Sequence, residues 1–483
     1  MTDENKKDSE SPATTSEAYD TMLPLWEKMN SVLGGTRTMR DAGKAYLPRH
    51  EEESETAYDE RLARSCFYNQ TRLTLESMVG RPFSDPMKLI EVPSQAEGWL
   101  ENIDLQGNSI GVFAREWFMA GVGKGFCHVL VEMPLPRDTE AEEGRARTLE
   151  DDRKEGLRPY WVMVPPESVI AAHATVVDGR EVVTHLRIKE CVVESDGFAE
   201  KKIERIKVWG VNPSQVTVYE KLKTDKKKEE WVPIQQYPFD LPYIPFVTYY
   251  AHRKGFMLSD PPLLDLADLN IAHWQSNSDQ TSILTVSRFP ILAAAGVTDS
   301  KDIIVGPYVS LATTDPAGRF YYVEHGGAAI EAGRQDLKDT EERMAEYGAM
   351  FLRKRPGSIT ATARALDSAE ATSPLQDMTV RFIDAVNNAL AITADWVKLE
   401  SLGQVELSTD FGPEEADGGD LAALGEARRN RDISRETLLR EFHRRGVLGD
   451  DFDAEQDEME LEEESAAIPT GETDTEIDEG AFA

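Results

Sequence analysis

One segment near the middle of the chain constrains the fold more than any other. Residues 258–289 read LSDPPLLDLADLNIAHWQSNSDQTSILTVSRF, and Pro290 follows directly. Ser259 or Asp260 is the predicted N-cap, with prolines at the first helical positions, which predicts a helix of roughly 40 Å. Its first half is apolar, whereas Gln275 to Ser282 is almost wholly polar. Such a helix begins against a core and then projects outward or packs on neighbouring subunits.

The sequence after this helix predicts a small β unit between two long helices. Short strands are expected in PILAAAGV, IIVGPYVSLAT and RFYYVEHGG, followed by a charged helix from Ala328 to about Arg353. A small, polar and flexible segment comes next. A third long helix is expected from Pro374 to about Leu402.

The first half of the chain predicts helices followed by strands. Helices are expected over Ser16–Leu33, where Pro24 breaks or kinks the helix, over Glu53–Gly80 as one element, and over Ser109–Ala120. Six short β-branched and aromatic runs between residues 125 and 239 then predict one antiparallel sheet. Residues 40 to 255 therefore form a mixed α+β lobe.

The net charge of −35 is unevenly distributed along the 483 residues. The stretch from Gly446 to Ala483 holds fifteen acidic and no basic residues, so −20 remains on residues 1–445. This tail and residues 1–16 are expected to be disordered. Before the tail, short helices are expected at Asp420–Arg429 and at Ser434–Arg444, with Ser434 as N-cap.

Composition excludes several classes of protein. No run of 18 apolar residues predicts a membrane span, and no apolar region marks a secretory signal at the N-terminus. The acidity argues against a broad basic face that grips nucleic acid, but not against a surface that lets it pass. Cys66, Cys127 and Cys191 are interpreted as small core residues of a protein in a reducing cytosol.

No motif predicts catalysis, a metal site or a cofactor. AGVGKGF (120–126) superficially suggests a phosphate-binding loop, but the required spacing is absent and it follows a helix rather than a strand. A helix-to-strand turn is the better interpretation. The eight histidines show no metal-ligand spacing, and acidic pairs are too common here to nominate a catalyst.

The densest basic feature beside a flexible segment is Arg353, Lys354, Arg355 and, further on, Arg364. One interpretation is a mobile loop that touches phosphates. The other is a cationic helix C-terminus that offsets the helix dipole. The residues alone favour the second.

The order of elements resembles that of the portal proteins of tailed bacteriophages. The stretch YLPRHEEESETAYDERLARSCFYNQTRLTLESMVGRPFSDP (46–86) looks like the opening of a portal family long catalogued only as a domain of unknown function. There a Leu-Pro, an acidic stretch, a Tyr-x-x-Arg-Leu and an Asn-x-Thr lead into a Gly-Arg-x-Phe. The segment SDPPLLDLADLNIAHWQSNSDQTSILTVSRFPIL resembles the same family's entry into its stem. The resemblance covers about residues 40 to 445.

The resemblance implies a portal-like α+β fold. The expected regions are a disordered N-terminus (1–16), a wing of helices and then an antiparallel sheet (17–258), stem helix 1 (259–289), a β clip (290–327), stem helix 2 (328–353), a tunnel loop (354–373), a tunnel helix (374–402), a helical crown (403–446) and an acidic disordered tail (447–483).

The resemblance also implies a structural rather than an enzymatic role. Portal proteins form a ring, typically of about twelve subunits, at one capsid vertex of the virion, and are assembled in the host cytoplasm. The ring nucleates the procapsid with major capsid or scaffolding protein, docks the terminase large subunit and the head-tail adaptor, and passes double-stranded DNA during packaging and ejection. The alternatives are another oligomeric virion protein that does not contact DNA, or a nucleic-acid-processing enzyme.

Two sets of residues acquire roles from this resemblance. Arg353, Lys354, Arg355 and Arg364 become the tunnel loop, making weak contacts with DNA that are not sequence-specific. Trp274, Gln275, Asn277 and Gln280, in and beside the polar half of the first long helix, are expected to pack between subunits of the ring.

Overall fold

The computed structural model describes residues 11–134, 156–177, 179–223, 229–288, 291–295, 316–323, 327–351, 373–409, 411, 418–444, 447–448 and 457. The chain divides into two compact units, Met1–Thr409 and Asp410–Ala483, each of which is described by itself. Helices and strands occur in separate runs, which is the α+β class expected from the sequence.

The first unit opens with helices. Their bounds are α2 (Glu17–Gly34), α3 (Thr36–Ala42), the 3₁₀ turn η1 (Gly43–Ala45), α4 (Glu55–Arg64), α5 (Gln70–Gly80), α6 (Glu97–Leu100) and α7 (Ile110–Lys124). Ser16 caps α2 by accepting the backbone N–H of Tyr19, and the helix continues through Pro24. Ser16 also donates its own N–H to the carbonyl of Ile170 at 3.0 Å. Residues 11–16, expected to be disordered, therefore have defined positions.

The single helix predicted over Glu53–Gly80 is wrong, because the chain forms α4 and α5 with a break between them. Ser65 is extended at the end of α4, and Asn69 caps α5 by accepting the N–H of Arg72 at 3.0 Å. The break turns Phe67 into the core, where its ring meets Trp274 edge-on at 6.1 Å. The apolar spacing continues across the break, which is why periodicity alone suggested one helix.

The strands form two main sheets rather than the one predicted. A three-stranded antiparallel sheet has the order β3-β2-β9, and a five-stranded antiparallel meander has the order β4-β5-β6-β7-β8. The bounds are β2 (Phe126–Glu132), β3 (Tyr160–Val164), β4 (Val169–Val177), β5 (Arg180–Asp196), β6 (Ala199–Val211), β7 (Ser214–Lys223), β8 (Glu229–Pro238) and β9 (Phe246–Tyr250). The 3₁₀ turn η2 (Pro166–Ser168) separates β3 from β4, so the chain changes sheet there.

The core of the first unit surrounds the three-stranded sheet. Helices α7 and α12 (Pro374–Val397) both contact β2 and β9. The ring of Phe382 on α12 lies 5.3 Å from Trp117, 5.1 Å from Phe118 and 4.9 Å from Tyr249. A Cβ on Gly121 would lie 2.3 Å from the ring of Tyr249, so only glycine permits this close approach. A second cluster, including Trp26 of α2, packs against the five-stranded sheet.

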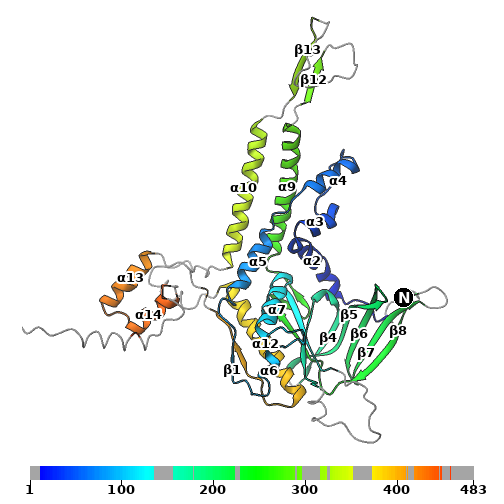
Figure 1. Ribbon diagram of the computed structural model, residues 1–483, viewed down its shortest axis with the longest axis vertical. Coiled ribbons are helices and arrows are strands. Elements are labelled where there is room, and N and C mark those ends of the chain that lie inside the picture. The colour runs from blue at the N-terminus through cyan, green and yellow to red at the C-terminus, as the bar shows by residue number, and fades with distance from the viewer. Residues whose placement is uncertain are drawn as a thin grey trace, which may run out of the picture. The chain divides into compact units, whose positions relative to one another are not determined.

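Two long helices lie side by side (Figure 1). They are α9 (Leu264–Arg288) and α10 (Gly327–Met350), with the antiparallel hairpin β12 (Ile291–Ala295) and β13 (Arg319–Val323) between them in the chain. This order confirms the predicted sequence of helix, small β unit and helix, followed by the third long helix α12. The expected strand IIVGPYVSLAT lies outside the described residues.

The predicted start of the first long helix is wrong by about one turn. Ser259 ends the short strand β11 (Leu258–Ser259), which pairs with β10 (Arg253–Gly255), and Ser259 Oγ donates to the carbonyl of Gly125 at 2.9 Å. The prolines precede the helix in a turn, because the backbone N–H of Leu264 donates to the carbonyl of Pro261. The serine thus anchors the approach to α9 rather than capping it.

One strand and the two predicted short helices complete the described elements near the C-terminus. Strand β14 (Gln404–Glu406) pairs with β1 (Lys88–Ile90) in the first unit. The second unit contains α13 (Gly418–Arg429) and α14 (Arg435–Arg444), and Ser434 accepts the N–H of Thr437 at 3.0 Å as the predicted cap. Most of the acidic tail lies outside the described residues.

Two smaller predictions have different outcomes. The segment 120–126 makes the predicted passage from helix to strand, although α7 continues to Lys124 and the turn itself is Gly125 at φ +91°. Lys124 pairs with Glu167 at 2.6 Å. The prediction of three core cysteines is wrong, since only Cys127 is buried and Cys66 and Cys191 are exposed. Within the described residues, no helix combines the length and apolar character needed to cross a membrane.

The aromatic cluster gives a first prediction. Phe382→Ala should lower the free energy of unfolding by about 3–5 kcal/mol, because it removes a fully buried ring and leaves a cavity among other rings. Urea denaturation followed by circular dichroism measures the change. Val380→Ala on the same helix, where the side chain is 46% exposed, should stay within about 0.5 kcal/mol. Equal effects of the two variants would refute this assignment of the core.

Candidate functional site: a long helix pair and the segment that braces it

The contact between α9 and α10 is largely polar. His273 Nε2 lies 3.2 Å from a carboxylate oxygen of Glu341, and the hydroxyl of Ser276 donates to Asp336 at 3.1 Å. His273 is buried, whereas Glu341 is about half exposed. These hydrogen bonds add to the apolar contacts of α10, where Ile330, Leu337 and Met344 are partly or fully buried at seven-residue spacing.

The closest approach of the pair lies near the start of α10. Gln280 donates through Nε2 to the carbonyl of Ile330 at 2.9 Å. A Cβ on Gly333 would lie 2.2 Å from Gln280 Oε1, so the absence of a side chain lets the glutamine fit between the helices. A small residue on α10 and a long amide on α9 thus fix the register of the pair.

Most side chains of helix α10 are exposed to solvent in a single chain. All 24 of its residues are described, and Met344 is the one that is buried. Met350 at its end is 63% exposed. A long helix in a folded protein is stabilised mainly by packing one apolar face, and α10 packs mainly against α9 alone.

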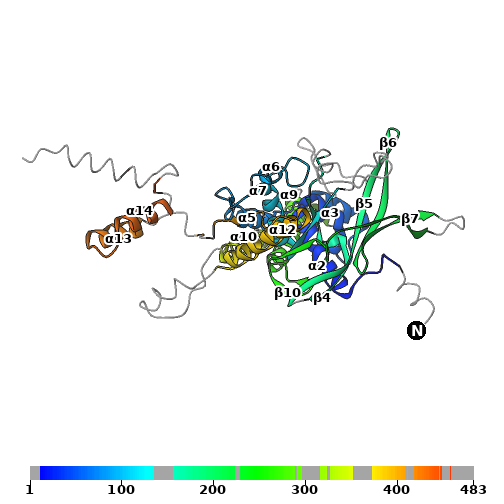
Figure 2. The ribbon, with the colours of Figure 1, turned by 90° about the horizontal axis from the view of Figure 1, so that it is seen from below.

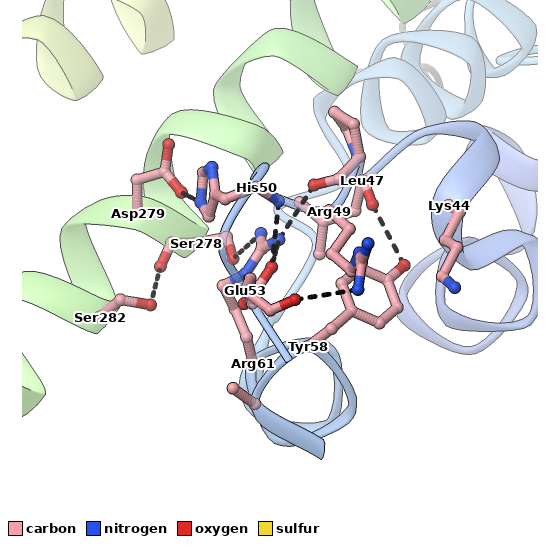
Figure 3. Close-up of polar contacts among 12 residues, drawn as sticks. Lys44, Leu47, Arg49, His50, Glu53, Tyr58, Arg61, Ser278, Asp279 and Ser282 are labelled. Carbon is pink, nitrogen blue, oxygen red and sulfur yellow. Dashed lines mark hydrogen bonds and ion pairs between the residues drawn. The ribbon is translucent and has the colours of Figure 1, made fainter. Parts of the chain in front are cut away.

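A buried ion pair between Glu53 and Arg61 connects the segment before α4 to the middle of α9 (Figure 3). This ion pair and the hydrogen bonds around it are called the brace below. The guanidinium of Arg61, 5% exposed, donates from Nε and Nη2 to the two carboxylate oxygens of Glu53 at 2.8 and 2.7 Å. Its Nη2 also donates to the carbonyl of Pro48, and its Nη1 reaches the hydroxyl of Ser278 on α9 at 3.4 Å. Charged pairs of this two-pronged form are strong and directional.

The ion pair with Arg61 lowers the pKa of the Glu53 carboxyl group. The hydrogen bond from Arg61 is the main cause that lowers the pKa of Glu53 from its ordinary 4.5 to about 2. The same carboxylate raises the pKa of Arg61. Both groups are therefore charged at neutral pH, and the pair is present wherever the protein works near neutrality.

Further contacts extend this brace along the chain. The hydroxyl of Tyr58 donates to the carbonyl of Leu47 at 3.1 Å, and the Arg61 guanidinium carbon lies 5.4 Å from the centre of the Tyr58 ring. His50 lies 3.2 Å from Asp279 on α9, on the exposed side of the network (Figure 3). The brace thus has a buried centre and a solvent-exposed rim.

A second buried contact joins α5 to the apolar half of α9. Asn270, completely buried, accepts both the N–H and the hydroxyl of Thr71 at 3.1 Å and donates to the carbonyl of Tyr68 at 2.7 Å. Asn69, which caps α5, donates to the carbonyl of Val32 at 2.7 Å. The Asn-x-Thr of the sequence therefore connects three helices.

The residues predicted for subunit packing all make contacts within the chain. Trp274 is fully buried, Gln275 donates to the carbonyl of Tyr46 at 2.7 Å, and Asn277 donates to that of Cys66 at 3.5 Å. Gln280 lies between α9 and α10, as described above. Their role between subunits stays a prediction.

The predicted tunnel-loop residues Arg353, Lys354, Arg355 and Arg364 lie outside the described residues. Sequence reasoning did not nominate the ion pair of Glu53 and Arg61 as a site. The spacing of the two residues could have indicated a contact, since Glu53 stands directly before the N-cap of α4 and Arg61 follows two turns later. Within the described ranges, no cluster of histidine, cysteine and acidic side chains suits a metal ion.

Comparisons with known proteins match the region of the long helices. A family model described as Domain of unknown function (DUF4055) matches residues 262–397, which include α9, α10 and α12. No curated protein matches the chain.

Two solved structures show low similarity to the chain. One, the neck of a native GTA particle computed with C12 symmetry, has 10% identity and a TM-score of 0.37, covering 77% of this chain and 88% of that one. Another, the neck of an empty GTA particle computed with C6 symmetry, has 11% identity and a TM-score of 0.35, covering 80% and 88%.

The brace predicts a pH-dependent loss of stability. Because the pKa of Glu53 is lower in the folded chain than its ordinary 4.5, its contribution is complete above about pH 4.5 and disappears as the pH falls towards about 2. Glu53→Gln should lower the free energy of unfolding by about 3 kcal/mol at pH 7, since it leaves Arg61 buried without a counter-charge. In urea denaturation, the difference in the free energy of unfolding between this variant and the wild type should narrow as the pH falls from 4.5 towards about 2.

Two controls accompany this prediction. The double variant Glu53→Gln, Arg61→Met should lose less stability than the sum of the single variants, because neither partner is left buried alone. Arg334→Met removes an exposed ion pair with Glu331 on α10 and should change nothing measurable at either pH. A difference between Glu53→Gln and wild type that is constant with pH would contradict the assignment.

Proposed function

We propose that this protein is a structural connector of a bacteriophage particle, and specifically its portal, a ring through which double-stranded DNA enters and leaves the capsid. The observation that carries the proposal is the pair α9 and α10 with a β-hairpin between them, placed after an α+β body and before the third long helix α12. This is the order of wing, stem, clip, stem and tunnel helix that the resemblance to portal proteins implies.

The exposure of α10 supports assembly into a ring. A helix of 24 residues with one buried side chain gains its missing packing when copies of the pair stand side by side. In a closed ring every copy has two neighbours, so every α10 has the same environment.

The charge supports DNA as a cargo that is passed rather than gripped. Each subunit carries −35, and a channel lined by such subunits would repel phosphates and limit adhesion during transit. Arg353, Lys354, Arg355 and Arg364 stand between α10 and α12 in the chain. As a tunnel loop they would supply weak, sequence-independent contacts with DNA.

The proposed role brings defined partners and no chemistry of its own. The ring would sit at one vertex of the virion, dock a terminase large subunit during packaging, and then bind a head-tail adaptor. Major capsid or scaffolding protein would surround it during assembly in the host cytoplasm. Hydrolysis of ATP would belong to the terminase, so the chain itself would be no enzyme.

Ring assembly is the first test of the proposal. The purified chain should form particles many times larger than its 54.0 kDa monomer, and negative-stain microscopy should show rings with a central channel. Light scattering over several salt concentrations measures the mass. Particles without a channel would favour the virion protein that does not contact DNA, and monomers under all conditions would refute the proposal.

The tunnel loop has a test of its own. Replacement of Arg353, Lys354, Arg355 and Arg364 by alanine should reduce DNA packaging or retention in infected cells while rings still assemble, because the loop acts on DNA rather than on neighbouring subunits. As a control, replacement of Arg37, Lys88, Lys189 and Lys254 by alanine removes the same number of charges at exposed positions outside both the loop and α10. Unchanged packaging in the loop variant would exclude the loop assignment.

A further inference from the structure

A pocket of about 740 Å³ lies where the end of α10 meets the starts of α9 and α12. Figure 2 shows α10 and α12 beside each other in this part of the first unit. The wall includes Tyr347 on α10, Phe351 directly after it, Asp265 in the first turn of α9, and Met378 and Arg381 on α12. The three long helices therefore build this pocket together.

The pocket carries more acidic than basic side chains. Its carboxylates and its guanidinium belong to Asp260, Asp265, Asp377 and Arg381. Arg381 pairs with Asp377 at 2.9 Å, and Lys254, which is outside the wall, pairs with Asp260. Asp265 has no lysine or arginine partner within the described ranges. Its carboxylate leaves the pocket with an excess negative charge.

Two aromatic rings lie beside this carboxylate. The hydroxyl of Tyr347 donates to a carboxylate oxygen of Asp265 at 3.4 Å, and the rings of Tyr347 and Phe351 meet edge-on at 5.6 Å. Both aromatic side chains are partly exposed at the pocket. Aromatic rings and a carboxylate together bind a guanidinium group, through cation–π contact and charge-assisted hydrogen bonds. The pocket therefore suits an arginine side chain.

The chain itself supplies arginines at this point. The structure describes the chain up to Phe351 and again from Ser373, and both residues line the pocket. Residues 352–372 hold four basic and two acidic residues, so their net charge is +2, opposite in sign to that of the pocket. Three of the basic residues follow Phe351 within four positions and are called the basic cluster: Arg353, Lys354 and Arg355. At about 3.8 Å between consecutive Cα atoms, this cluster is anchored within reach of the pocket.

This tether favours the basic cluster over any free occupant. A group held a few residues from its binding site has an effective concentration on the order of millimolar, so that even a weak contact is populated. A free cationic peptide would have to exceed that concentration to displace it. The proximity in the chain thus selects the same chain as the source of the occupant.

We propose that the basic cluster docks in this pocket when DNA is absent, with one guanidinium against Tyr347 and Phe351 and paired with Asp265. DNA phosphates compete for the same cations, so docking lowers the affinity of the cluster for DNA. The docking stands on the pocket and its charges, whereas the competition rests on the proposed function. The pocket would thereby keep the contacts of the tunnel loop with DNA weak.

Limited trypsin digestion tests the docking. Trypsin cleaves after arginine and lysine, so a docked cluster is cut slowly at Arg353 and Lys354. Asp265→Asn should raise the rate of cleavage there at least about fivefold, because the undocked population grows. The matched control is Asp268→Asn on the same helix, where the carboxylate pairs with Lys28 outside the pocket, and it should leave the rate unchanged.

Cleavage at Arg343 within α10 serves as an internal reference for this digestion. Mass spectrometry identifies each cleaved site, and circular dichroism checks that both variants are folded. An equal acceleration at Arg343 would mean that Asp265→Asn loosens the helix rather than releasing the cluster, and would overturn the docking.

DNA affinity gives the second readout. With assembled protein and a short DNA duplex at fixed salt, fluorescence anisotropy should show Asp265→Asn binding at least about threefold more tightly than the wild type, since docking no longer reduces the competent fraction. Asp268→Asn removes the same charge and measures the general electrostatic effect. When the basic cluster is replaced by alanine, the two variants should bind DNA alike.

The outcomes separate this inference from the proposed function. Equal cleavage in Asp265→Asn and Asp268→Asn would overturn the docking, even if rings assemble and package DNA. A tighter binding of Asp265→Asn that survives removal of the basic cluster would overturn the competition, as would unchanged DNA affinity. A chain that shows the trypsin effect but forms no rings would refute the proposed function and leave the docking in place.

Discussion

The buried pair of Glu53 and Arg61 is the contact on which the geometry of the helix pair depends. The second half of α9 carries mostly polar side chains, so no apolar core holds it to the body. Arg61 connects that half, through Ser278, to the segment before α4. A two-pronged ion pair fixes the position of the Arg61 guanidinium, whose Nη1 lies 3.4 Å from the hydroxyl of Ser278 and so helps to hold this half of α9. The register of α10 then follows from its hydrogen bonds to α9.

Sequence patterns predicted the elements whose signals are local. The presence of α9, the hairpin after it and the cap at Ser434 follow from spacing and end signals within a few residues, although α9 begins about one turn later than its signals predict. The break at Ser65–Asn69 was missed because apolar spacing continues through it, and only the contact of Phe67 with Trp274 shows why the chain turns. The second sheet was missed because β9 pairs with β2 across more than a hundred residues.

The brace was missed for a different reason. In a chain with 88 acidic residues, Glu53 looks like one more solvated carboxylate. Glu53 and Arg61 are only eight residues apart, but the sequence does not show that the pair is buried against α9. The resemblance to portal proteins rests partly on the same stretch, residues 46–86. In the structure, Leu47, Tyr58 and Arg61 of its motifs take part in the brace, and Asn69 and Thr71 connect the helices.

Two surfaces of a single chain are exposed to solvent: that of helix α10 and that of the turn between β5 and β6. Most side chains of α10 are exposed and one is buried, and Phe198 on the β5–β6 hairpin is fully exposed. The exposed side chains of α10 are mostly charged or small, whereas Phe198 is large and apolar and costs solubility unless something covers it. The two surfaces belong to different elements, so one contact does not cover both of them. A twofold dimer uses the same patch on each copy and would therefore cover only one of the two surfaces. A cyclic arrangement gives every copy two different contacts, one on each side, and so satisfies both surfaces with a single kind of neighbour.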